Sequence, residues 1–167
     1  MTSNIKRIVI TALMTSMVCV TTMMIKIPSP MKGYINIGDC MVLICAWMLP
    51  AGYGFVAAGL GSALADLFSG YLIYAPATFV IKGCMSLFAF LIFKAINKKV
   101  GKLSAEIVGG IVAELFMVAG YFLFEGFLYG FVPSLVNIPA NLIQGAAGLV
   151  IGVVLIKIFD KLNISVE

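Results

Sequence analysis

Long apolar runs separated by short polar breaks cover almost the whole chain. A hydrocarbon core about 30 Å thick is crossed by roughly 20 apolar residues of helix. The first run follows Lys6 and Arg7. It exceeds the apolar core of a secretory signal, and no small-residue cleavage site follows it, so we expect it to be retained. The pattern predicts an all-α integral membrane protein forming one domain over 1–167, with spans at about 6–25, 39–50, 52–69, 76–96, 104–124 and 137–158.

The apolar stretch over 40–68 is ambiguous, because Pro and Gly residues interrupt it at 50–54 and either one tilted helix or two short ones would fit. Cytoplasmic loops carry an excess of Lys and Arg, which decides between the two. With a turn at 50–54, only Lys26 and Lys32 lie outside, whereas a single span would turn the basic loop at 94–102 outward. We therefore predict six transmembrane helices with both termini cytoplasmic. The inner cations are then Lys6, Arg7, Lys94, Lys98, Lys99, Lys102, Lys157 and Lys161.

Composition supports the membrane assignment and excludes several functions. Hydrophobic residues make up 62% of the chain and charged residues 11%, with a mean hydropathy of +1.14, more than a soluble core of this size can bury. The net charge of +4 does not indicate nucleic acid, because the cations lie at helix ends. The chain has no His, no CxxC pair and no Walker-type loop, so we expect neither an enzyme nor a metal site, disulfide framework or bound cofactor.

The predicted topology collects polar side chains at the outer face. The outer loops are 26–39, 69–75 and 125–136, and beneath them ionisable groups enter the apolar spans, where each is costly and marks a functional site by default. Carboxamides recur at 137, 141 and 144, on one helical face. They either hydrogen-bond neighbouring helices or line a pocket. The residues predicted to bind a small, flat, polar-edged substrate are Tyr34, Asn36, Asp39, Tyr74, Lys82, Glu114, Tyr121, Asn141 and Gln144.

Lys82 and Glu114 are the two ionisable groups deepest in the predicted spans. Lys82 would form an ion pair with Asp66 or with Glu114, which does not exclude contact with a ligand. Glu114 begins a helical stripe that Val118, Tyr121 and Glu125 continue toward the outside. Both groups are therefore expected to face the interior of the bundle.

Two clusters of small residues permit close helix approach. One, in the first helix, contains Ala12 and Ser16; the other occupies 57–63. Internal packing explains such a face as well as a partner subunit does. Since no segment of the chain could bind a nucleotide, active uptake would need partner subunits.

Several segments together resemble a known family, the substrate-binding S-components of energy-coupling factor (ECF) vitamin transporters. They are the Gly-Tyr-Ile-Asn-Ile-Gly-Asp loop at 33–39, the run Gly-Leu-Gly-Ser-Ala-Leu-Ala-Asp at 59–66, the segment at 74–83 and Ile-Pro-Ala-Asn-Leu-Ile-Gln at 138–144. The likeness covers essentially the whole chain. Within the family it is nearest to S-components assigned to hydroxymethylpyrimidine or vitamin B6 compounds.

The resemblance implies a mechanism and partners. S-components of the family capture a vitamin at the outer face of the bacterial plasma membrane, with the first loop as a lid, and topple in the membrane to release it inside. They dock through an Ala-x-x-x-Ala motif of the first helix onto a transmembrane coupling subunit that carries two ABC-type ATPases. Here Ala12 and Ser16 occupy the motif. The implied partners are therefore that subunit, the ATPases, the vitamin and membrane lipid, with no nucleic acid.

Two other functions fit the same sequence. A self-sufficient proton-coupled carrier would use Asp66, Lys82 and Glu114 as a proton relay, although such carriers usually contain repeats and none is evident between 1–83 and 84–167. A membrane scaffold would have no reason to bury charged and amide side chains on converging faces.

Overall fold

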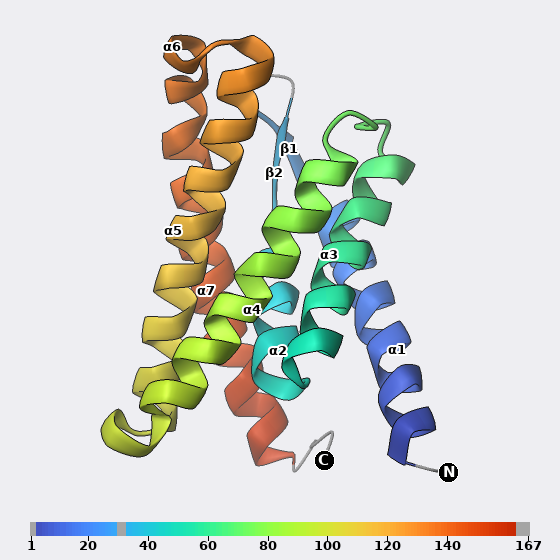
Figure 1. The fold of residues 1–167 in the computed structure, drawn as a ribbon, viewed down its shortest axis with the longest axis vertical. Coiled ribbons are helices and arrows are strands. Elements are labelled where there is room, and N and C mark those ends of the chain that lie inside the picture. The colour runs from blue at the N-terminus through green and yellow to red at the C-terminus, as the bar shows by residue number, and fades with distance from the viewer. Residues whose placement is uncertain (1–2, 30–32, 163–167) are drawn as a thin grey trace.

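The computed structural model describes residues 3–29 and 33–162. Lys32, which is predicted to lie in the outer loop at 26–39, falls outside these ranges. The elements are almost all helical (Figure 1). In chain order they are α1 (Ser3–Met24), β1 (Lys26–Pro28), β2 (Tyr34–Asn36), α2 (Asp39–Met48), α3 (Ala51–Phe68), α4 (Ala75–Val100), α5 (Lys102–Tyr129), α6 (Phe131–Ser134), the 3-10 turn η1 (Leu135–Asn137) and α7 (Ile138–Lys161).

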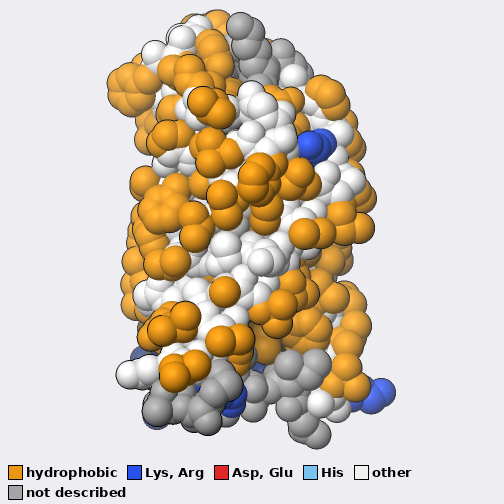
Figure 2. All heavy atoms as spheres, turned by 90° about the vertical axis from the view of Figure 1, so that its right-hand side faces the viewer, with side chains coloured by type: hydrophobic (Ala, Val, Ile, Leu, Met, Phe, Trp, Pro, Cys, Tyr) orange, Lys and Arg blue, Asp and Glu red, His pale blue; other side chains and the backbone are white. Residues whose placement is uncertain are grey.

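The long helices form an upright bundle whose outer surface is apolar. Five helical segments among the described residues are long and apolar enough to cross a membrane, the last of them running from α6 through α7. Large hydrophobic side chains remain exposed along these helices, as Figure 2 shows for one face. Both termini lie at the same end of the bundle (Figure 1). An apolar belt of this kind matches the hydrocarbon of a bilayer, and the protein is a multi-pass membrane protein.

The stretch over 40–68 forms two helices, α2 and α3, separated by Leu49 and Pro50. With 10 residues, α2 is only about 15 Å long, too short to cross the hydrocarbon alone. β1 and β2 form a hairpin in which Ile27 pairs with Ile35. The hairpin lies between the helices, in the half of the bundle away from α2 (Figure 1). The chain therefore enters the bundle as a strand and continues as a helix that begins at the buried Asp39.

Small residues of α3 serve internal packing. A Cβ atom built on Gly61 would lie 2.6 Å from the carbonyl oxygen of Thr15 and 2.7 Å from Cβ of Val18, both on α1. On Gly59 it would lie 2.6 Å from the carbonyl oxygen of Phe79 on α4. These glycines therefore allow α1, α3 and α4 to approach closely, so at these positions the small-residue stretch packs within the bundle.

Gly61→Ala is expected to lower the free energy of unfolding by about 1–3 kcal/mol, the usual effect of overpacking. The added methyl group would meet the backbone of Thr15, which cannot move without shifting α1. Gly52→Ala, in the same helix, is the matched control because a Cβ there meets nothing within 4 Å. Thermal unfolding in detergent measures both variants, and equal stability of the two would contradict the packing argument.

Candidate functional site

A polar cavity lies between the β1–β2 hairpin and the surrounding helices, on the side of the bundle away from the termini. Its free volume is only about 30 Å³, room for one or two water molecules. A molecule larger than a few atoms can enter only if the hairpin or the lining side chains move. The lining residues are Ser29, Gly33, Tyr34, Asn36, Asp66, Tyr71, Tyr74, Thr78, Tyr121, Glu125, Asn141 and Gln144.

Tyrosines and a carboxylate form one wall of this cavity. The hydroxyl of Tyr34 donates a hydrogen bond of 2.6 Å to Oδ1 of Asp66, and the rings of Tyr34 and Tyr71 lie 4.7 Å apart between centroids. The hydroxyls of Tyr121 and Thr78 lie 3.1 Å apart. This wall offers flat aromatic surface next to hydrogen-bonding groups.

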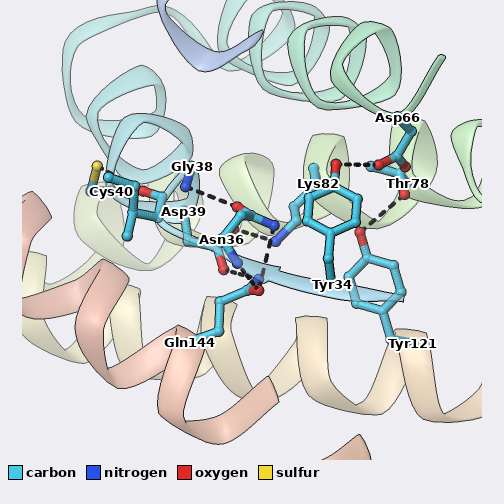
Figure 3. A network of polar contacts seen from close by, with 11 residues as sticks. Tyr34, Asn36, Gly38, Asp39, Cys40, Asp66, Thr78, Lys82, Tyr121 and Gln144 are labelled. Carbon is cyan, nitrogen blue, oxygen red and sulfur yellow. Dashed lines mark hydrogen bonds and ion pairs between the residues drawn. The ribbon is translucent and has the colours of Figure 1, made fainter. Parts of the chain in front are cut away.

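A buried network links the hairpin to three helices (Figure 3). The backbone N–H of Asn36 donates to Oε1 of Gln144 at 2.9 Å, and Nε2 of Gln144 donates to Oδ2 of Asp39 at 2.7 Å. The other carboxylate oxygen of Asp39 forms an ion pair with Lys82. The side-chain oxygen of Asn36 accepts from the N–H of Gly38 at 2.8 Å. The position of the hairpin is thus coupled to a buried charge pair.

The predicted partner of Lys82 was wrong. Lys82 contacts Asp39, not Asp66 or Glu114, and its Nζ lies 5.5 Å from the ring centroid of Tyr121. The difference arises because β2 enters the bundle and delivers Asp39, fully buried, to the level of Lys82. Asp66 is instead held by Tyr34.

A second polar cluster lies near the C-terminal end of α5. Nδ2 of Asn137 donates to Oε1 of Glu125 at 2.8 Å, and the hydroxyl of Tyr74 lies 3.4 Å from the same oxygen. All three residues are buried. Of the predicted carboxamides, Asn137 therefore joins helices, whereas Asn141 and Gln144 line the cavity.

Glu114 is predicted to bind substrate, but the structure does not place it in the wall of the cavity. It lies against α7, where a Cβ on Gly145 would be 2.9 Å from Oε2 and one on Gly148 3.2 Å from Oε1. Neither carboxylate oxygen has a hydrogen-bond partner among the described residues. Glu114 instead lines an apolar groove between α5 and α7.

Sequence reasoning missed Thr78 altogether and considered Asp66 as an ion-pair partner or a member of a proton relay, without predicting that it lines the cavity. Both line the cavity. The spacing of Tyr74, Thr78 and Lys82 at intervals of four places all three on one face of α4, a signal that could have identified Thr78. The Asp66 side chain had no comparable signal, because its neighbour Tyr34 comes from the hairpin.

The two predicted docking residues, Ala12 and Ser16, are both exposed on α1. The Ser16 hydroxyl donates to the carbonyl oxygen of Ala12 at 3.0 Å, so this polar group is satisfied within the helix. Thr11 and Thr15 on the same helix are buried toward the bundle. The small face of α1 is therefore open to another membrane subunit.

An apolar helical bundle that encloses a polar, aromatic-walled cavity defines a class of membrane proteins, those that bind a small polar molecule within their helices. The sequence places the chain more narrowly. Residues 2–161 match the family model described as "ECF-type riboflavin transporter, S component". The chain belongs to this family and is a substrate-binding subunit of an ECF transporter, which confirms the resemblance to S-components as a family.

A solved chain from "Structure and mechanism of the S component of a bacterial ECF transporter" has the same fold, with a TM-score of 0.72 and 21% identity over 96% of this chain and 99% of that one. A Pyrococcus woesei protein described as "Uncharacterized protein in gap 3'region" is 36% identical over 136 residues, 81% of this chain and 88% of the relative. S-components of the family bind substrate for transport and partner with an ECF transmembrane subunit and ATPases, which hydrolyse the ATP.

Proposed function

We propose that this S-component captures a water-soluble vitamin or precursor with a flat nitrogen heterocycle at the extracellular face of the membrane. The observation that carries this proposal is the cavity beneath the hairpin, with tyrosine rings and hydrogen-bonding side chains on its walls. Flat heterocycles stack on such rings, and their polar edges need partners of this kind.

The distribution of cations supports the proposed orientation in the membrane. Lys94, Lys98, Lys99, Lys102 and Lys157 belong to helix ends that lie at the same end of the bundle as both termini. Because basic residues accumulate on the cytoplasmic side, this end is inside and the cavity opens outside. The hairpin with α2 then makes the second of six crossings.

Hydroxymethylpyrimidine or a vitamin B6 compound is the favoured ligand. Asp66 and Glu125 both line the cavity, and Oε2 of Glu125 has no hydrogen-bond partner among the described residues. An ionised carboxylate can only accept hydrogen bonds, so it suits amino, hydroxymethyl and protonated ring-nitrogen groups. Riboflavin is the second candidate, because the family's description names it. The carbonyl edge of its ring is less suited to carboxylates.

Titration of the detergent-purified protein with hydroxymethylpyrimidine, pyridoxine and riboflavin tests the ligand. We expect one of the first two to bind at least about tenfold more tightly than riboflavin, since a mismatched buried hydrogen-bonding group costs about 1–3 kcal/mol. Mass spectrometry of the small molecule that co-purifies gives an independent identification. Tighter riboflavin binding would reassign the ligand, and binding of none of the three would argue against this ligand class.

Delivery is proposed to need an ECF coupling subunit and two ABC-type ATPases. Reconstitution in vesicles distinguishes the alternatives: an S-component moves vitamin only with its partners and ATP, a proton-coupled carrier moves it alone under a proton gradient, and a scaffold never does. A proton relay would need contacts among Asp66, Lys82 and Glu114, but each of these residues contacts a different partner. This arrangement supports an S-component over a proton-coupled carrier.

Ala12→Trp is expected to prevent co-purification with the coupling subunit while leaving vitamin affinity unchanged. The new ring would stand on the exposed small face of α1, where close helix approach needs small side chains. Leu13→Trp, also exposed but outside the Ala12–Ser16 pair, is the control. Normal assembly of Ala12→Trp would remove this face from the docking surface.

A further inference from the structure

A second cavity, of about 380 Å³, lies at the opposite end of the bundle from the substrate cavity. It exists because α2 is short: the turn at Leu49 and Pro50 borders this cavity, while α4 and α7 extend beyond it toward the end that holds the termini (Figure 1). Its lining combines aromatic and basic side chains. The residues that the argument uses are Arg7, Trp47, Phe90, Phe93, Lys94 and Lys102.

The cations of this cavity differ in whether a carboxylate neutralises them. Lys102 pairs with Asp160 at 2.5 Å and lies 3.9 Å from Glu106. Arg7 and Lys94 have no carboxylate within 4.0 Å among the described residues, and both are exposed. Lys94 lies over the ring of Phe90, 5.6 Å from its centroid. The cavity therefore carries an excess of positive charge from two helices, α1 and α4.

The remaining lining is apolar apart from one unused donor. Phe90, Phe93 and Trp47 supply aromatic surface, and the indole Nε1 of Trp47 is buried with no hydrogen-bond partner among the described residues. A soluble anion would satisfy the cations but leave the aromatic surface in water. A molecule with both an anionic group and an apolar body satisfies both parts.

We propose that this cavity binds the headgroup of an anionic phospholipid from the cytoplasmic leaflet, with the phosphate near Arg7 and Lys94 and the upper acyl carbons against the aromatic wall. The leaflet assignment rests on the orientation given with the proposed function. Basic pockets between helices at the cytoplasmic surface suit such headgroups because charge and apolar contact act together. A lipid held there would join α1 to α4.

Trp47 makes the proposal measurable, because it is the only tryptophan of the chain. The full chain is reconstituted in vesicles containing either phosphatidylglycerol or phosphatidylcholine whose acyl chains are brominated near the glycerol. We expect bromine quenching of Trp47 to favour phosphatidylglycerol several-fold. Arg7→Gln combined with Lys94→Gln should abolish that preference, so that the two lipids quench Trp47 to the same extent.

Lys98→Gln combined with Lys99→Gln is the matched control. It removes the same charge from exposed positions that do not line the cavity, and the preference should survive. If the two lipids quench equally, or if this control loses the preference as fully, the site is overturned. Loss of the preference on adding inorganic phosphate would assign the cavity to a soluble anion and overturn the lipid.

Two further measurements keep the result interpretable. The single variant Lys94→Gln replaces the double one if the latter does not fold, with a partial loss of preference expected and no loss counting against the site. Vitamin titration of each variant is independent of the quenching. Failure of vitamin binding in the unmodified chain would therefore count against the proposed ligand class, while failure of the lipid preference would count against this cavity alone.

Discussion

Lys82→Met is expected to lower the free energy of unfolding by about 3–5 kcal/mol, because removing one member of a buried ion pair leaves the other charge without its partner. The Lys82 and Asp39 residues are 2% and 0% exposed, respectively. In the variant, Asp39 would keep only the hydrogen bond from Gln144 at 2.7 Å. Thermal unfolding of the detergent-solubilised protein, followed by circular dichroism, measures the loss.

The double variant Lys82→Met with Asp39→Leu tests the cause. With neither charge left in the bundle, much of the lost stability should return, giving a coupling free energy of up to about 3 kcal/mol in a double-mutant cycle. Lys98→Met makes the same chemical change at an exposed position of α4 and should alter stability by less than about 0.5 kcal/mol. Additive losses in the double variant would show that the two side chains do not act as a pair.

The hydrophobic pattern was sufficient to predict the long helices, because an apolar run of helical length has few other solutions in a membrane. It could not predict the hairpin. β1 and β2 have three residues each, too few for strand periodicity to appear, and their pairing joins Lys26 to Asn36 across a polar loop. A prediction that lacks the hairpin places Asp39 in an outer loop, whereas the structure buries its side chain completely.

The helical stripe from Glu114 to Glu125 shows a different limit. Spacing correctly placed Tyr121 and Glu125 along one cavity. Helical spacing identifies which face of a helix a residue lies on. It does not show where along the helix axis a neighbouring helix packs against that face. Glu114 lies seven residues before Tyr121, about 10 Å along the axis, where α7 packs through Gly145 and Gly148. The carboxylate therefore lies against backbone below the cavity.

Gln144→Leu is expected to weaken vitamin binding by on the order of 100-fold while leaving a folded protein. The Gln144 amide connects the hairpin to the bundle: it accepts from the N–H of Asn36 and donates to Asp39. Leucine fills a similar volume but satisfies neither group, and each unsatisfied buried group costs about 1–3 kcal/mol. The hairpin would then lose its fixed position over the cavity. Part of the binding free energy of the vitamin would be spent on ordering the hairpin, which lowers the affinity.

Calorimetric titration with the co-purifying vitamin measures the affinity of Gln144→Leu, and size-exclusion chromatography with thermal unfolding shows whether the protein remains folded. Asn97→Leu is the control, since it exchanges an amide for leucine on α4 away from the cavity lining. Its affinity should be unchanged. Unchanged affinity in Gln144→Leu as well would exclude this network from substrate capture. Loss of affinity with retained folding would instead mean that the hairpin must be anchored before the vitamin is held, since Gln144 both lines the cavity and holds Asn36.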